Sequence, residues 1–124
     1  KTEAELNDRN QIKVLTDKSG RALAMSRQPI PSLFGIKSMG RGTHWKQICI
    51  IPFKYSILKK FVSFEQTNLE KYESIDMMRL IENGIAVGTA VYEGAESHAV
   101  DTPEDLKKVE GLLKTDPLLK ELFL

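Results

Sequence analysis

The sequence predicts an α/β fold with a mixed sheet, a β-hairpin and flanking helices. Short apolar runs bounded by turn residues indicate strands, and apolar side chains spaced by three or four indicate amphipathic helices. These elements alternate too irregularly for a helical bundle, and helices are too frequent for a β-sandwich. With 124 residues, the chain amounts to one domain or a piece of one.

The hairpin is predicted near the start of the chain. Residues 12–16 (IKVLT) and 22–26 (ALAMS) are strand-like, and the residues between them, DKSG, favour a turn in which Gly20 takes a positive φ. Residues 27–45 hold two prolines and three glycines without any period, so we expect a long loop there.

A third strand is expected at residues 47–53, QICIIPF. Its continuous apolar run is typical of a strand that is buried on both faces. Cys49 lies inside this run, so we expect a buried small hydrophobic residue and not a reactive thiol. Because it is the only cysteine, no disulfide can form within the chain.

Two helices are expected next. Residues 54–64 carry apolar side chains at helical spacing. Thr67 begins a second helix, Glu70 completes its capping box, and residues 83–84 (NG) end it. Glu70 also starts an acidic series at i, i+3 and i+6 on this helix, which is either a solvated face or one whose last member, Asp76, faces a polar ligand.

The last third of the chain predicts strands at residues 85–93 and 98–100 and helices at 103–113 and 116–124. Thr102 can cap the first of these helices, and Asp105 supplies the matching carboxylate three residues later.

Asp101 is therefore not needed for this cap. It stands where a predicted strand ends and a helix begins, which is where open α/β sheets place ligand groups. Three roles are open to its carboxylate: a second helix cap, a hydrogen-bond acceptor for the loop, or a ligand for a hard cation such as Mg²⁺. A metal site would need a second carboxylate, and no other residue of the chain is an obvious partner.

The charge balance excludes several kinds of partner. The chain has 18 basic and 17 acidic residues, so we expect no nucleic acid and no anionic membrane as partner. Residues 37–46 would suit an RNA-touching loop or a solvated loop whose Trp45 packs at an interface, and the balanced charge favours the second. No apolar run reaches about 18 residues, and we expect a cytoplasmic protein. Residues 1–10 are polar, as in a linker or a cut end.

Four segments in this order and spacing resemble one family. IKVLTDKSGRALAMSRQPIP, KQICIIPF, TNLEKYESIDMMRLIENG and VDTPEDLKKVE are similar to the C-terminal half of the CMP-Kdo synthetases, the 3-deoxy-manno-octulosonate cytidylyltransferases, which are close in fold to the acylneuraminate cytidylyltransferases. The resemblance covers residues 10–113. It implies the C-terminal part of a Rossmann-like nucleotide-diphospho-sugar transferase fold. It also implies an enzyme that transfers CMP from CTP to an acidic 2-keto sugar and releases pyrophosphate.

The resemblance also implies roles for individual residues. Asp101 matches an aspartate that binds Mg²⁺ together with an aspartate of the N-terminal half. Arg27 matches an arginine near the sugar carboxylate, a group that a guanidinium can bind through two hydrogen bonds. Asp76 matches a glutamate near the sugar, and Gln47 takes the place of a histidine in the substrate pocket. No catalytic residue is assigned.

Some positions depart from the family pattern. Ile51 replaces a tyrosine of the same strand as Gln47, and Met77 replaces a glutamine. These changes remove hydrogen-bonding groups, so they imply a different acidic sugar or a relaxed pocket.

The nucleotide loop of the family, Gly-Ser/Ala-x-Arg-x-x-x-Lys, is absent from the sequence. The resemblance therefore implies that residues 11–124 are a sugar-binding and dimerisation half without the CTP-binding half, inactive alone. A chain of this length leaves much apolar surface uncovered, so we expect a homodimer. The alternative is a non-catalytic dimerisation or binding module derived from the same family.

Overall fold

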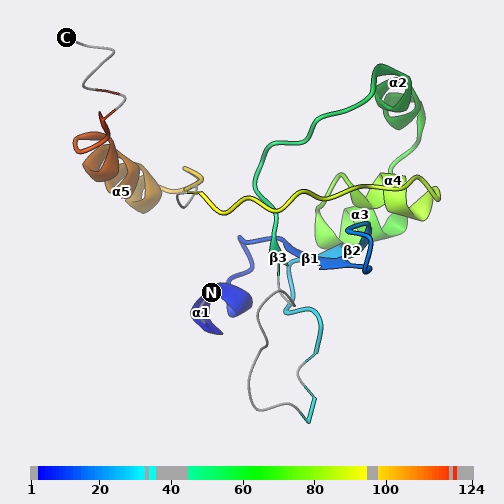
Figure 1. Ribbon diagram of the computed structural model, residues 1–124, viewed down its shortest axis with the longest axis horizontal. Coiled ribbons are helices and arrows are strands. Elements are labelled where there is room, and N and C mark those ends of the chain that lie inside the picture. Colours follow the sequence, from blue (N-terminus) through cyan, green and yellow to red (C-terminus); the bar gives the residue numbers. More distant parts are fainter. Residues whose placement is uncertain (1–2, 33, 36–44, 95–97, 118, 120–124) are drawn as a thin grey trace. The chain divides into compact units, whose positions relative to one another are not determined.

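The computed structural model describes residues 3–32, 34–35, 45–94, 98–117 and 119. The chain divides into two compact units, Lys1–Val91 and Tyr92–Leu124, each of which is described by itself. Figure 1 shows the elements in chain order. They are α1 (Glu3–Asn7), β1 (Lys13–Thr16), β2 (Ala22–Ser26), β3 (Trp45–Lys46), α2 (Tyr55–Ser63), α3 (Asn68–Glu73), α4 (Met78–Glu82) and α5 (Pro103–Leu113).

The predicted hairpin is confirmed. β1 pairs with β2 on one side and β3 on the other, so the sheet has the order β2-β1-β3 and is antiparallel throughout. In the turn, an Asp17 carboxylate oxygen accepts hydrogen bonds from the backbone N–H groups of Ser19 (2.8 Å) and Arg21 (3.0 Å). Gly20 has φ +79°, a conformation that L side chains rarely adopt.

The predicted strand at residues 47–53 is wrong. β3 contains only Trp45 and Lys46, and the backbone then turns, since Ile50 N–H donates to Ile48 O at 2.8 Å. Because the segment leaves the sheet edge at this turn, its apolar side chains are not enclosed between layers. Cys49 is exposed, so the prediction that it is buried is also wrong.

The helices α2 and α5 form where the sequence predicts them, but the expected helix over 67–82 divides into α3 and α4. Ser74 ends α3 in the left-handed conformation, with φ 55° and ψ 51°. A helix cannot continue through that conformation, so the chain turns and resumes at Met78.

Three other expectations had different outcomes. Residues 85–93 form no strand of their own, although Ala22 N–H donates to Val87 O and Thr89 N–H donates to Gly20 O, both at 2.8 Å, around an Arg21–Gly88 bridge. No strand forms at 98–100. The segment expected to be a linker, residues 1–10, contains the helix α1. Most of the helix expected at 116–124 and residues 37–44 of the expected loop lie outside the described residues.

The core of the first unit lies between the hairpin and the α3–α4 segment. Val14, Ala22 and Met25 of the sheet form one cluster with four residues that follow α3 or belong to α4: Ile75, Met77, Met78 and Leu80. Phe53, Ile57 and Phe61 pack against this cluster from the α2 segment. In the described parts of the chain, no helix is long and apolar enough to cross a membrane.

Candidate functional site

Two of the predicted site residues lie at the same end of the sheet. Lys13 of β1 is the register partner of both Ser26 in β2 and Lys46 in β3. Arg27 and Gln47 are the next residues along these outer strands, and Gln47 N–H donates to Ile12 O at 2.9 Å. The antiparallel pairing therefore brings Arg27 and Gln47, which are twenty positions apart in the sequence, to the same end of the sheet, on either side of β1.

The Arg27 guanidinium is held by backbone carbonyls. Its Nε donates to Glu73 O (2.8 Å), Nη1 to Arg9 O (3.0 Å) and Nη2 to Ser74 O (3.1 Å). A guanidinium has five N–H groups, so these bonds leave two of them for another acceptor. A carboxylate can accept both, which makes Arg27 suitable for binding an acid.

Glu73 fixes the end of β2 against α3. Its carboxylate accepts hydrogen bonds from Ser26 Oγ (2.8 Å) and from Arg27 N–H (2.9 Å). Asp76 follows two residues after Ser74, whose carbonyl binds Arg27, and Asp76 is exposed. The interaction recorded for Asp76 is with Arg79, whose pKa is raised by its hydrogen bond to Glu70 and, to a smaller extent, by the charge of Asp76.

Lys13 is a part of this region that sequence reasoning missed. It is only 2% exposed, and its Nζ donates to Asp8 O (2.6 Å), Gln11 O (2.8 Å) and Arg27 O (2.7 Å). Burial lowers the pKa of Lys13, partly opposed by the negative charge of Asp8. A lysine beside apolar residues in a hairpin strand is ordinarily solvated, so no local signal identifies it.

Gln47 carries an unused acceptor. Its side-chain Oε1 is buried and has no hydrogen-bond partner among the described residues. A buried carbonyl without a donor is unfavourable by about 1–3 kcal/mol.

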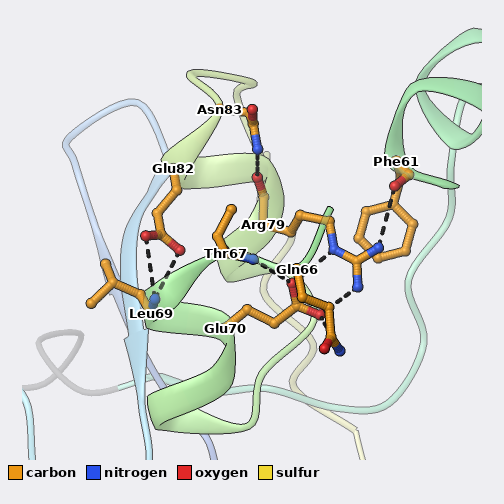
Figure 2. Close-up of polar contacts among 8 residues, drawn as sticks. All are labelled: Phe61, Gln66, Thr67, Leu69, Glu70, Arg79, Glu82 and Asn83. Atoms are coloured by element: carbon orange, nitrogen blue, oxygen red, sulfur yellow. Dashed lines mark hydrogen bonds and ion pairs between the residues drawn. The ribbon is translucent and has the colours of Figure 1, made fainter. Parts of the chain in front are cut away.

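The acidic series on the α3–α4 segment is not a uniform solvated face. Figure 2 shows that Glu70 pairs with Arg79, whose Nε donates to Glu70 Oε2 at 2.7 Å and whose Nη2 donates to Glu70 Oε1. This bidentate hydrogen bond lowers the pKa of Glu70 although burial opposes the effect. Arg79 also donates to Phe61 O (3.4 Å), so the pair joins α2, α3 and α4 and is structural.

Asp101 stands before α5 in the second unit and is exposed. The predicted cap is confirmed, since Asp105 N–H donates to Thr102 Oγ1 (3.1 Å) and Asp105 Oδ2 accepts from Thr102 N–H (3.0 Å) and Thr102 Oγ1 (2.7 Å). The hydrogen bond from the Thr102 hydroxyl lowers the pKa of Asp105. Asp101 gives only its backbone N–H to this cap, at 3.3 Å, and no described residue binds its carboxylate.

The four predicted site residues therefore fall into two groups. Arg27, Gln47 and Asp76 belong to the first unit, and Asp101 belongs to the second. Within the described ranges, no group of three or more histidine, cysteine or acidic side chains is arranged to hold a metal ion.

Comparisons with known proteins identify the family of the chain. A family profile described as "Cytidylyltransferase" matches residues 1–112. The 3-deoxy-manno-octulosonate cytidylyltransferase of Rickettsia prowazekii (strain Madrid E) is 39% identical over 103 residues, which are 83% of this chain and 39% of that protein. The protein of the same name from Thermodesulfovibrio yellowstonii is 40% identical over 110 residues, covering 86% of this chain and 42% of that protein.

A solved structure shows the same fold. It is a CMP:2-keto-3-deoxy-manno-octonic acid synthetase complexed with CTP, with a TM-score of 0.78 and 28% sequence identity. The match covers 92% of this chain and 46% of the synthetase chain. The chain thus spans about two-fifths of the length of these curated relatives. The predicted nucleotide-sugar transferase fold is confirmed, and the chain belongs to the cytidylyltransferase family.

Proposed function

We propose that the protein carrying this chain transfers a cytidylyl group from CTP to an acidic 2-keto sugar of the Kdo type. The anomeric hydroxyl of the sugar would form a bond to the α-phosphorus of CTP, the bond from that phosphorus to the β-phosphate would break, and pyrophosphate would leave. The observation that carries the proposal is the family match over residues 1–112, together with relatives named as cytidylyltransferases of this sugar.

Three residues of the first unit suit the binding of an acidic sugar. Arg27 has two N–H groups that its carbonyl partners leave over, and we assign these to the sugar carboxylate. Asp76 is an exposed acceptor for sugar hydroxyl groups, and Gln47 offers a buried carbonyl oxygen that has no donor among the described residues. Both are short-range hydrogen-bonding groups, so they would set the orientation of the sugar.

Asp101 fits the metal of such a reaction. Mg²⁺ prefers oxygen ligands and is ordinarily bound by one or two carboxylates together with substrate phosphates. Asp101 offers an exposed carboxylate that the helix cap does not use. When bound, Mg²⁺ would neutralise the charge that develops on the transferred phosphate.

We also propose that the protein is a homodimer. Several large apolar side chains of the first unit are exposed, among them Phe34 (97%), Tyr55 (73%) and Val62 (70%). Exposed apolar side chains of this size are typical of interfaces, and two-fold homodimers are the commonest closed assemblies.

The proposed activity is tested by incubating the protein that carries this chain with CTP, Kdo and Mg²⁺ and measuring both pyrophosphate and the CMP-linked sugar. The expected result is equal amounts of the two products, with no product from ATP or GTP. Binding of Kdo without any turnover would instead support the alternative of a non-catalytic binding module.

A further inference from the structure

We propose that Lys13 is a positioning residue that prepares Arg27 to bind the carboxylate of the substrate. The inference rests on the proposed function, because it assigns a task to Arg27 within that reaction. The relevant observation is a buried ammonium group whose three hydrogen-bond acceptors are all backbone carbonyls.

Lys13 acts on Arg27 by two routes. Its Nζ binds the carbonyl of Arg27 directly at 2.7 Å, which fixes the main chain at the end of β2. It also binds the carbonyls of Asp8 and Gln11, which are on either side of the Arg9 carbonyl that accepts from Arg27 Nη1. The ammonium thus fixes both the backbone of Arg27 and the turn that holds its guanidinium.

A purely stabilising ion pair does not explain this arrangement. Burying a lysine is unfavourable unless the ammonium is well bonded, and an apolar side chain in its place would avoid that penalty. Among the described residues, no carboxylate lies within ion-pair distance of Lys13. Its hydrogen bonds instead go to the segments that hold Arg27, as expected of a group that preorganises a binding residue.

Preorganisation has a measurable consequence. A guanidinium that is already held in place loses little conformational freedom when it binds a carboxylate. Without Lys13, Arg27 would keep its bonds to Glu73 O and Ser74 O, but its main chain and the Arg9 turn would be less fixed. The ligand would then have to supply that part of the order. The binding of the acidic sugar should therefore weaken, while the binding of CTP should not.

The test is steady-state kinetics of the protein with Kdo and CTP for K13M, R27K and the double variant. K18M, which changes an exposed lysine of the hairpin turn, is the matched control. We expect K13M to raise KM for Kdo about tenfold or more, the effect of losing one charged hydrogen bond, and to leave KM for CTP within about twofold. K18M should leave both values unchanged. In the R27K background K13M should add no further effect, because residues that act through one another are not additive.

An equal rise of both KM values, or effects of K13M and R27K that multiply, would overturn the inference and leave Lys13 a structural residue. If K13M does not fold, NMR of the unsubstituted protein tests the positioning role of Lys13 instead. The same measurement applies if the unsubstituted protein has no activity, in which case the proposed function itself fails. Slow solvent exchange of the Lys13 ammonium and the Arg27 Nε–H is expected, relative to the exposed side chains of Lys18 and Arg9 as internal controls. Fast exchange of either group would refute the positioning role.

Discussion

Replacing Glu70 by glutamine should destabilise the first unit strongly. The Glu70 side chain is 2% exposed and accepts two hydrogen bonds from the Arg79 guanidinium and one from Thr67 N–H, at 3.3 Å. Glutamine has nearly the same shape, but its amide NH₂ is a donor, and it would face N–H donors where the carboxylate oxygen accepts from them. One of the two hydrogen bonds from Arg79 is lost and the partly buried guanidinium is left without its counter-charge, so we expect E70Q to lower the free energy of unfolding by about 3 kcal/mol or more.

Thermal and urea unfolding, followed by circular dichroism, measure this effect. For a unit of this size each kcal/mol moves the unfolding midpoint by about 4–8 °C, so the midpoint should fall by about 12 °C or more. The matched control is E65Q, the same chemical change at an exposed residue five positions earlier, which should stay within about 0.5 kcal/mol. If E70Q and E65Q lose the same free energy of unfolding, the prediction for Glu70 is wrong. That result would show that the desolvation cost of the buried Glu70–Arg79 pair cancels its attraction.

Three further predictions concern pH, assembly and the isolated chain. The hydrogen bonds from Arg79 lower the pKa of Glu70 from its ordinary value of 4.5, so below that pH the unfolded chain binds more protons than the folded chain and the free energy of unfolding should fall. The fall should be shallower in E70Q. If the free energy of unfolding falls equally in both proteins between pH 7 and pH 3, the prediction is wrong. In sedimentation equilibrium at micromolar concentration the protein should be a dimer, and a clean monomer would end the homodimer proposal. The 124-residue chain alone should release no pyrophosphate from CTP and Kdo, because it spans about two-fifths of its curated relatives, and measurable release would show that this portion suffices.

Interactions between residues close in sequence were predictable. The cap of α5 depends on Thr102 and Asp105, three positions apart, and the turn of the hairpin depends on Asp17 and Gly20. Both are recognisable because the hydrogen-bonding side chain and its backbone partner are specified within one short segment.

Interactions between distant residues were not predictable. Arg27 Nη2 binds Ser74 O across 47 positions, and Lys13 binds Arg27 O across 14. A lysine inside a strand gives no sign that its ammonium will meet carbonyls and not water, because that outcome depends on how the hairpin, the preceding turn and α3 pack together.

The wrong strand at residues 47–53 has a related cause. An apolar run indicates burial, but it does not show where a strand leaves the sheet. The Ile48–Ile50 turn ends β3 after Lys46, and this turn has no glycine, proline or asparagine within it to announce it. The division between α3 and α4 is similar, since Ser74 is an unusual residue for a left-handed conformation.

Thr102 and Asp105 cap α5 without using the Asp101 carboxylate, and we propose that this carboxylate binds the metal of cytidylyl transfer. The most direct test compares D101N with D105N in the protein that carries this chain, measuring Mg²⁺-dependent formation of CMP-sugar from CTP and Kdo beside thermal unfolding. We expect D101N to lower the rate about 100-fold or more with an unchanged unfolding midpoint. D105N should lower the midpoint and keep most of the rate. A D101N variant that retains the rate in Mg²⁺ but loses stability would contradict the claim and make Asp101 a structural residue.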